Sequence, residues 1–437
     1  MKFKIHRGTK EIGGSCVEVS TESTRILLDF GMPLVDEYGE DFNFYPYKDL
    51  SQQELIGEGI LHDIDGLYPN SENLIDGIVI SHAHQDHIGL LQYVHPNINY
   101  YLGAATHEII KLGNIFNRKD LQLKNFFHFT KSVTFKIGDI SITPYWNDHS
   151  GFDAYSFLLQ ANNKSIFYSG DFRSHGRKTN AFEWLLKHAP QNVDYLLLEG
   201  TTIGSSDEPF KTEDALEQEF TTLFKNSDCI NYIWTSSQNI DRLVSIYKAC
   251  IASNKTFVVD VYTANVLHTL SRFAKLPTPL KDFKQIKVLF PYILTANLYE
   301  RNLDEYVNKF AKSKITKETL SASPSDYVVI VRPNMKVDIE RITAPKGNRI
   351  YSMWDGYKKK PYTKEFLDWF TSKNFTIVDI HTSGHADTPT LKRLVEAIKP
   401  KYIVPIHTSK GDNYQDIFDY PVVRLKDEEV QEVKSED

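Results

Sequence analysis

The chain has 437 residues, more than one ordinary hydrophobic core accommodates, so we expect two domains or one domain with a large insertion. Hydrophobic residues make up 41% and charged residues 24%, which is typical of a globular protein, and no apolar run approaches the roughly 18 residues of a membrane span. The formal net charge of −7 argues against nucleic-acid binding through bulk electrostatics and leaves only a local site for it.

The cellular compartment is indicated by the N-terminus and the cysteines. The opening sequence MKFKIHRGTK is charged and contains no apolar segment of the kind found in secretory signals. Cys16, Cys229 and Cys250 are scattered and form no CxxC motif, which favours a reducing compartment. We therefore expect a cytoplasmic protein without membrane attachment.

The first part of the chain reads as strands followed by a long connection. Three strand-like runs lie at 2–8, 15–21 and 25–31. Residues 32–73 are aromatic and polar without a clear period, which predicts a long loop with short helices near the functional site. Short strands then alternate with helices, and the predicted strands lie at 76–81, 98–103, 132–138, 140–146, 154–160, 165–171 and 193–200.

A second sequence pattern begins near residue 212. Predicted helices and strands alternate regularly there, which predicts a small parallel sheet. The predicted helices lie at 212–226, 239–253 and 263–275, and the strands at 230–236 and 255–261. After Tyr357 the earlier pattern returns, with helices at 363–373 and 387–399 and strands at 376–380 and 402–406. We predict a sandwich-like α/β domain formed by residues 1–210 and 356–437, with an α/β domain inserted at 211–355.

Three histidines and an aspartate occur within six residues directly after an apolar run: His82, His84, Asp86 and His87. Strand alternation would send the first three to one side, and a helix is expected from about Ile88. Imidazole and carboxylate groups are ligands of zinc and manganese. Because ligand vectors from so short a span diverge, we expect two ions to share these residues. The alternative interpretation is a polar turn that is rich in histidine.

Further candidate ligands follow other predicted strands. His149 follows the strand at 140–146, Asp171 follows Gly170 at the end of another, and His407 follows the strand at 402–406. A carboxylate can bridge two cations with its two oxygens, so Asp171 is the expected bridge. Each residue alone could be a turn residue or a core histidine, and their shared position at strand ends favours a metal site.

Two more residues are candidates for catalysis, together with Asp86. Glu199 ends an apolar run, and His385 lies in the turn HTSGHA between a strand and a helix. A histidine beside two metal ions can protonate a leaving oxygen or bind a phosphate, and a carboxylate can orient it. Ser383 and Gly384 in the same turn are expected to contact the substrate. The alternative for HTSGHA is a capped helix N-terminus.

Two basic segments are candidate contacts for a polyanionic substrate. Arg173 and Arg177 follow Asp171 in DFRSHGRK and are expected to bind substrate, with a solvated turn as the alternative. The segment Tyr357–Lys360 combines aromatic and basic character, which fits a contact to single-stranded nucleic acid and an exposed helix start equally well.

The residues together resemble a known family. SHAHQDH resembles the HxHxDH signature of the metallo-β-lactamase fold, and its order with the later candidates is similar to that in β-CASP nucleases, ribonuclease J among them. The resemblance covers nearly the whole chain and implies an α/β fold: an αββα sandwich with an inserted β-CASP α/β domain. It implies that Glu199, His385 and His407 fill three family motifs. Histidine at the third motif is typical of RNA-processing members, whereas DNA-processing members typically carry an aliphatic residue.

The chain also departs from ribonuclease J. That family has a C-terminal domain beyond the matched part and a Gly-rich GSQGEP-like turn where this chain reads VRPNMKV. Dimerisation, processive exonuclease action and recognition of a 5′-phosphate are therefore not implied by the resemblance.

These observations lead to one expected function. We expect a metal-dependent hydrolase that cleaves RNA phosphodiester bonds, as an endonuclease, a 5′ exonuclease or both. One divalent ion would be held by His82, His84 and His149, and the other by Asp86, His87 and His407, with Asp171 between them. Zinc is the expected metal and manganese the alternative. The alternative functions are a DNA nuclease of the same fold and a non-catalytic or small-ester metallo-hydrolase. RNA is the expected partner, and no oligomer is implied.

Overall fold

The computed structural model describes residues 1–36, 40–117, 121–205, 208–281 and 283–434. The chain divides into two compact units. Unit 1 comprises Met1–Ser174, Lys178–Pro209 and Gly384–Asp437, and unit 2 comprises His175–Arg177 and Phe210–Ser383.

The first sheet of unit 1 has the strand order β20-β1-β2-β3-β4-β5-β6. Neighbouring strands are antiparallel from β20 to β3 and parallel from β3 to β6. The strands are β1 (Lys2–Arg7), β2 (Cys16–Ser20), β3 (Arg25–Leu28), β4 (Gly77–Val79), β5 (Asn99–Leu102), β6 (Asn125–His128) and β20 (Val430–Glu432). The three opening strands are therefore confirmed.

The second sheet of unit 1 has the order β19-β11-β10-β9-β8-β7. From β7 to β10 the neighbours are antiparallel, and β10, β11 and β19 are parallel. The strands are β7 (Phe135–Ile137), β8 (Ile140–Trp146), β9 (Tyr155–Ala161), β10 (Lys164–Tyr168), β11 (Tyr195–Glu199) and β19 (Tyr402–Ile406). Three adjacent strands thus end at the same edge of this sheet.

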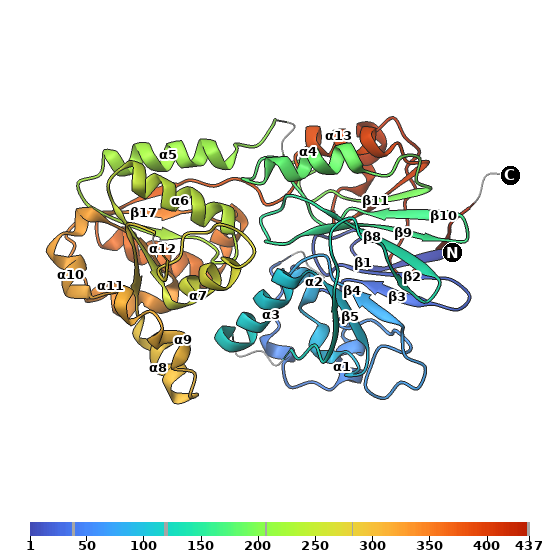
Figure 1. Ribbon diagram of the computed structural model, residues 1–437, viewed down its shortest axis with the longest axis horizontal. Coiled ribbons are helices and arrows are strands. Elements are labelled where there is room, and N and C mark those ends of the chain that lie inside the picture. Colours follow the sequence, from blue (N-terminus) through green and yellow to red (C-terminus); the bar gives the residue numbers. More distant parts are fainter. Residues whose placement is uncertain (37–39, 118–120, 206–207, 282, 435–437) are drawn as a thin grey trace. The chain divides into compact units, whose positions relative to one another are not determined.

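The core of unit 1 lies between the two sheets. Alternate residues of each strand face inwards, so that Ile5 and Val19 of the first sheet belong to one apolar cluster with Phe157 and Leu197 of the second. Helices α4 (Thr179–His188) and α13 (Thr388–Ile398) cover the outer face of the second sheet (Figure 1). The first sheet is accompanied by α1 (Gln52–Gly57), α2 (Gln85–Ile88) and α3 (Ala104–Asn117). The predicted α/β sandwich is confirmed.

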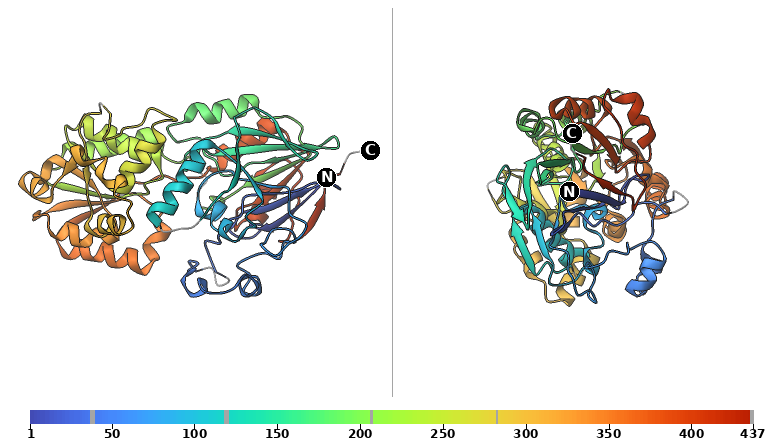
Figure 2. Two further views of the ribbon diagram at one scale, coloured as in Figure 1. Left: turned by 60° about the horizontal axis from the view of Figure 1, so that its bottom comes forward. Right: turned by 90° about the vertical axis from the view of Figure 1, so that its right-hand side faces the viewer.

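The first and last strands of the described chain are neighbours. Lys2–Lys4 of β1 pair in antiparallel register with Val430–Glu432 of β20 (Figures 1 and 2). Further along β1, the His6 side chain is buried, and its Nδ1 lies 2.8 Å from Oε1 of Glu428, just before β20. The last described segment is therefore an integral part of the first sheet.

The long segment after β3 contains short helical pieces, as predicted. They are the 3₁₀ turn η1 (Tyr45–Tyr47) and helix α1, which Ser51 and Glu54 begin with a reciprocal capping box. Residues 37–39 of this segment lie outside the described residues. The beginning of the segment lies next to a candidate ligand, because the Met32 backbone N–H donates to the Gln85 carbonyl at 3.0 Å.

Unit 2 contains a parallel sheet of seven strands in the order β15-β14-β13-β16-β12-β17-β18. The strands are β12 (Ile230–Trp234), β13 (Thr256–Asp260), β14 (Ile286–Leu289), β15 (Lys314–Ile315), β16 (Tyr327–Ile330), β17 (Gly347–Tyr351) and β18 (Phe375–Asp379). The longer helices are α5 (Glu213–Lys225), α6 (Ile240–Ala252), α7 (Val261–Leu270), α8 (Tyr292–Glu300) and α12 (Pro361–Ser372). The shorter ones are α9 (Glu305–Asn308), α10 (Lys317–Ala322) and α11 (Lys336–Glu340).

The start of this α/β series agrees with the sequence pattern. Thr212 caps α5 by accepting a hydrogen bond from the Ala215 N–H, and Asn239 caps α6 by accepting one from the Arg242 N–H. Among the described residues of both units, we find no helix that combines the length and the apolarity of a membrane span.

The predicted return to the first domain at residue 356 is wrong. β18 pairs in parallel with β17 over five residues, from Gly347 opposite Phe375 to Tyr351 opposite Asp379. Phe366 and Phe370 of α12 pack into the core of unit 2. The chain therefore stays in unit 2 until Ser383. Local periodicity predicted this strand and helix correctly, but it could not say which sheet the strand joins.

We predict that Thr212→Ala lowers the free energy of unfolding by about 1 kcal/mol, because the Ala215 N–H loses its acceptor at the start of α5. Urea denaturation of the full chain measures the change. Thr222→Ala, at an exposed position in the same helix, is the matched control and should be neutral or slightly stabilising. Equal destabilisation by both substitutions would contradict the capping role.

Candidate metal centre

Several candidate side chains meet because parallel strands end at one sheet edge. Asp171 follows β10, Glu199 is the last residue of β11, and His407 directly follows β19. These three strands are adjacent and parallel. Because β9 is antiparallel to both of its neighbours, β8 points the same way as β10 and leads to His149 at the same edge. The strand-end argument from the sequence thus describes real neighbours.

The histidine-rich segment reaches this edge from the first sheet in a different way from that predicted. β4 ends at Val79, His84 is the N-cap residue of α2, and the helix itself carries Asp86 and His87. The expected strand alternation over His82–Asp86, with a helix beginning near Ile88, is therefore wrong. The backbone of α2 is fixed by the chain after β3, whose Phe30 N–H donates to the His87 carbonyl at 2.8 Å.

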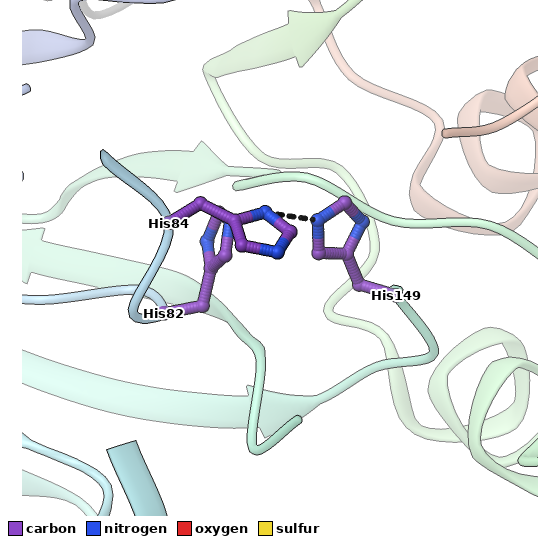
Figure 3. Close-up of side chains that lie close together, drawn as sticks. All are labelled: His82, His84 and His149. Atoms are coloured by element: carbon purple, nitrogen blue, oxygen red, sulfur yellow. Dashed lines mark hydrogen bonds between the residues drawn. The ribbon is translucent and has the colours of Figure 1, made fainter. Parts of the chain in front are cut away.

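The first group of side chains consists of His82, His84 and His149 (Figure 3). His84 Nδ1 lies 3.1 Å from His82 Nε2 and 3.1 Å from His149 Nε2. Burial lowers the pKa of His84 to about 4 and the pKa values of the other two rings well below the usual range. The three rings are neutral at pH 7, and their converging nitrogen lone pairs suit a divalent cation.

The second group consists of Asp86, His87, Asp171 and His407, all of them buried. His407 Nε2 lies 3.1 Å from Asp86 Oδ2, and His87 Nε2 lies 3.1 Å from Asp171 Oδ2. Burial acts to lower the pKa of His87, but the carboxylates of Asp171 and Asp29 raise it. Within the group the ligand atoms lie within 4.8 Å of one another, which is compact enough for one ion.

The Asp171 carboxylate joins the two groups. Its Oδ2 lies 3.7 Å from His82 Nε2 and 4.0 Å from His149 Nε2 on one side. On the other side it lies 3.1 Å from His87 Nε2 and 3.9 Å from His407 Nε2. No hydrogen-bond partner for the buried Oδ1 occurs in the part of the chain that the structure describes. An unsatisfied carboxylate oxygen amid imidazoles is the chemistry of a metal site, so the residues fit one.

Glu199 and His385 lie beside these groups. His385 Nδ1 is 3.3 Å from Glu199 Oε2 and 3.8 Å from Asp171 Oδ2. Burial acts to lower the pKa of His385, but the carboxylates of Glu199 and Asp171 raise it to about 9. Glu199 is itself fixed, because its Oε1 accepts from the Phe172 N–H at 3.0 Å and its Oε2 from the Thr201 hydroxyl at 2.8 Å. The two residues form a rigid pair at the edge of the candidate centre.

Asp29 supports the centre and was missed from the sequence. Its Oδ2 lies 2.8 Å from His87 Nδ1 and accepts hydrogen bonds from the hydroxyls of Ser81 and Tyr168. A carboxylate behind a ligating imidazole fixes the ring and its tautomer. The available signal was its position just after β3, which is the same strand-end signal that identified Asp171.

The two arginines predicted to bind substrate form ion pairs within the protein, and both predictions are corrected. Arg173 is completely buried, with its Nε 3.5 Å from Asp148 Oδ1, so no substrate can reach it. Arg177 belongs to unit 2, where it forms ion pairs with Asp214 and Glu217 of α5. Both guanidinium groups are thus engaged by carboxylates of the protein.

Ser383 and Gly384 lie at the boundary between the units. The Ser383 carbonyl accepts from His175 Nε2 at 2.8 Å within unit 2. Gly384 packs closely on Ser150, whose Oγ would lie 2.5 Å from an added Cβ. These contacts leave substrate binding by either residue as a prediction.

Comparison with known protein families agrees with this geometry. Residues 66–218, which include all the candidate ligands except His407, match a family described as the beta-lactamase superfamily domain. Residues 372–413, which include His385 and His407, match the Zn-dependent metallo-hydrolase RNA specificity domain. The chain thus contains a segment that matches the beta-lactamase superfamily domain and a second one that matches an RNA specificity domain. Its His and Asp side chains form groups that could hold a metal ion.

Individual relatives match along most of the chain. It is 23% identical to Ribonuclease J of Helicobacter pylori (strain B128), over 92% of this chain and 55% of that protein. It is 22% identical to an RNase J-like protein of Methanocaldococcus jannaschii, over 95% of this chain and 93% of that protein. The chain thus spans about half of the Helicobacter protein and nearly all of the Methanocaldococcus protein.

Solved structures share the fold. A protein of unknown function from Enterococcus faecalis V583 superposes with a TM-score of 0.79 at 21% identity and covers 98% of this chain and 99% of its own. The likeness extends over both units of the chain and concerns the fold alone.

We predict that Gly31→Ala destabilises the protein by at least about 1–3 kcal/mol, because a Cβ there would lie 1.7 Å from the Asp86 carbonyl oxygen. Thermal unfolding measures the loss. Gly113→Ala in α3 is the control, since no atom lies within 4 Å of its added Cβ, and it should stabilise by about 0.5–1 kcal/mol. A Gly31 variant as stable as the parent would show that this packing is not restrictive.

Proposed function

We propose that this protein is a metal-dependent ribonuclease that hydrolyses phosphodiester bonds. The observation that carries the proposal is the His385–Glu199 pair, whose ring nitrogen lies 3.8 Å from the carboxylate that joins the two ligand groups. A metal site alone would suit many hydrolases. A positioned histidine beside it suits a reaction in which an oxygen must leave with a proton.

The substrate class has independent support. The RNA specificity domain matches the segment that contains His385 and His407. Relatives named Ribonuclease J and RNase J-like are similar over more than 90% of this chain. Cytoplasmic location, as predicted, stays part of the proposal, and its support is the three cysteines, all of which are thiols.

We propose two divalent cations, most simply zinc, one at each group. His82, His84 and His149 would hold the first, and Asp86, His87 and His407 the second, with Asp171 shared. When bound, two such ions polarise a phosphodiester and lower the pKa of water. The protein itself supplies the geometry, because the buried ligands are held by strand ends and by Asp29 and cannot reorganise freely.

His385 would protonate the departing oxygen. Because its Nδ1 faces Glu199 at 3.3 Å, Nε2 is the ring nitrogen that would face the substrate. Glu199 keeps the ring in this orientation, since both of its oxygens are fixed by hydrogen bonds. Ser383 and Gly384, which immediately precede His385, would place the phosphate backbone next to the ring.

We predict that His84→Ala and Asp86→Ala each reduce cleavage of labelled single-stranded RNA to background while the protein stays folded. His385→Ala should lower kcat by about 10²–10⁴-fold, the usual contribution of a general acid. His188→Ala, an exposed histidine on α4, is the control and should leave the rate unchanged. Single-stranded DNA of the same sequence, digested in parallel, tests the substrate class.

Two results would contradict the proposal. Undiminished cleavage by a folded, metal-free His84→Ala protein would exclude the metal role. Cleavage of the DNA with the RNA left intact would assign the protein to DNA processing instead.

We predict that Asp29→Asn weakens zinc binding by about 10–100-fold, because His87 loses the carboxylate that orients it. Calorimetric titration of chelator-treated protein with zinc measures both affinity and stoichiometry, and we expect two equivalents for the parent. Asp76→Asn, at an exposed position just before β4, is the matched control and should bind zinc as the parent does. Equal affinities of the Asp29 variant and the parent would rule out this supporting role.

A further inference from the structure

Unit 2 carries an exposed group of aromatic and basic side chains, which we call the aromatic–lysine surface. It begins three residues after the carboxyl end of β17, follows the 3₁₀ turn η6 (Asp355–Lys359) and continues into the first turn of α12 (Figure 1). Its members are Trp354, Tyr357, Lys359, Lys360, Tyr362 and Lys364. In parallel sheets, ligands commonly bind beyond the carboxyl ends of the strands.

The aromatic rings of this surface are presented to solvent. Trp354 is 59% exposed and Tyr362 is 53% exposed, although large aromatic rings are usually buried. One part of the Trp354 ring lies against Gly356, where an added Cβ would be 2.3 Å from Cη2. The Tyr357 ring meets Trp354 edge-on, with centroids 5.3 Å apart. The Trp354 ring is thus backed by protein and still offers area for stacking.

The surface is locally basic in an acidic protein. Residues 354–364 contain four lysines and one aspartate, whereas the whole chain has a formal net charge of −7. Lys358 is used internally, because its Nζ lies 3.0 Å from Asp355 and 2.8 Å from Asp379. These ion pairs neutralise Asp355 and hold η6 in place. Lys359 and Lys364 are exposed, and Lys360 Nζ lies 4.6 Å above the Tyr357 ring.

A buried positive charge lies beneath this region. Arg349 of β17 is completely buried, and its guanidinium carbon lies 5.1 Å from the Trp234 ring and 5.3 Å from the Tyr351 ring. Across the described part of unit 2, none of its three nitrogens has a hydrogen-bond acceptor. No carboxylate among the described residues therefore cancels this charge at hydrogen-bond range, and it adds to the positive field of the lysines.

We propose that the aromatic–lysine surface binds single-stranded RNA, with bases stacked on Trp354 and Tyr362 and phosphates bound by Lys359 and Lys364. In sequence, the exposed side chains alternate between rings and ammonium groups, as bases and phosphates do along an unpaired strand: Trp354, Lys359, Tyr362 and Lys364. Paired bases hide their faces inside a duplex, so the surface selects single strands. The choice of RNA as the strand rests on the proposed function.

Binding of a fluorescein-labelled oligouridine to the full chain, followed by anisotropy in EDTA to prevent cleavage, tests the proposal. We expect Trp354→Ala/Tyr362→Ala to raise Kd about tenfold, which corresponds to about 1.4 kcal/mol. Trp354→Phe, which keeps a ring, should bind nearly as the parent does. Lys359→Glu/Lys364→Glu should weaken binding and reduce the slope of log Kd against log salt concentration by about 0.7 for each phosphate that is no longer neutralised.

Two matched controls separate this surface from general effects. Tyr292→Ala removes another exposed ring, 59% accessible on α8, and Lys373→Glu reverses a charge at the far end of α12. Both should bind the oligouridine as the parent does. Thermal unfolding shows whether each variant is folded, and the lysine variants test the surface even if the tryptophan variant is not.

The outcomes distinguish this proposal from the ribonuclease function. Unchanged Kd in both double variants overturns the surface proposal, whatever the cleavage assay shows. Equal losses for double-stranded and single-stranded RNA in the aromatic variant overturn the stacking role. RNA binding that depends on the surface, in a protein that cleaves no RNA, supports the surface proposal and overturns only the nuclease.

Discussion

A buried carboxylate is unfavourable unless charged or hydrogen-bonded neighbours replace the water that it has lost, and Asp171 is buried among five imidazole rings. Those rings come from the segment after β4, from helix α2, from the ends of β8 and β19, and from the turn before α13. Both sheets of unit 1 must therefore be in register before these rings surround the carboxylate. The fold of unit 1 is thus a condition for the contacts that define the candidate centre.

Residues outside the two ligand groups also hold the candidate centre in place. Asp29 fixes His87, and the Thr201 hydroxyl lies 2.9 Å from His407 Nδ1 while it donates to Glu199. Gly151 lets the chain pass close to the first group, since a Cβ there would be 3.0 Å from the His82 ring. Such a site favours a fixed arrangement of ligands over an adaptable one, which suits chemistry that depends on the distance between two cations.

Most of unit 1 and nearly the whole candidate centre could be predicted from the sequence. One rule applied to several residues: side chains that directly follow strands are expected to meet at one edge of a sheet. Asp171, Glu199 and His407 follow strands that are parallel neighbours, so strand ends in the sequence became neighbours in space. The same rule failed for Arg173, since position after a strand does not determine whether a side chain turns inwards. It failed for Arg177 because its partners, Asp214 and Asp241, lie 37 and 64 positions away.

The domain boundary shows a second limit of prediction from the sequence. The strand β18 has an ordinary half-exposed pattern that could join either sheet, and only its pairing with β17 assigns it to unit 2. The choice goes with the packing of α12 in one core cluster with Tyr232 and Tyr351, which local periodicity does not reveal. Periodicity predicts elements well and their partners poorly.

The two ligand groups also differ in how far apart their members lie in the sequence. His84 and His149 are separated by 65 positions, whereas Asp86 and His407 are separated by 321. Because the chain is made from its N-terminus, all residues of the first group are translated soon after β8, while the second group must wait for β19. Unit 2 is translated in between. The complete set of ligands therefore exists only after unit 2 has been made.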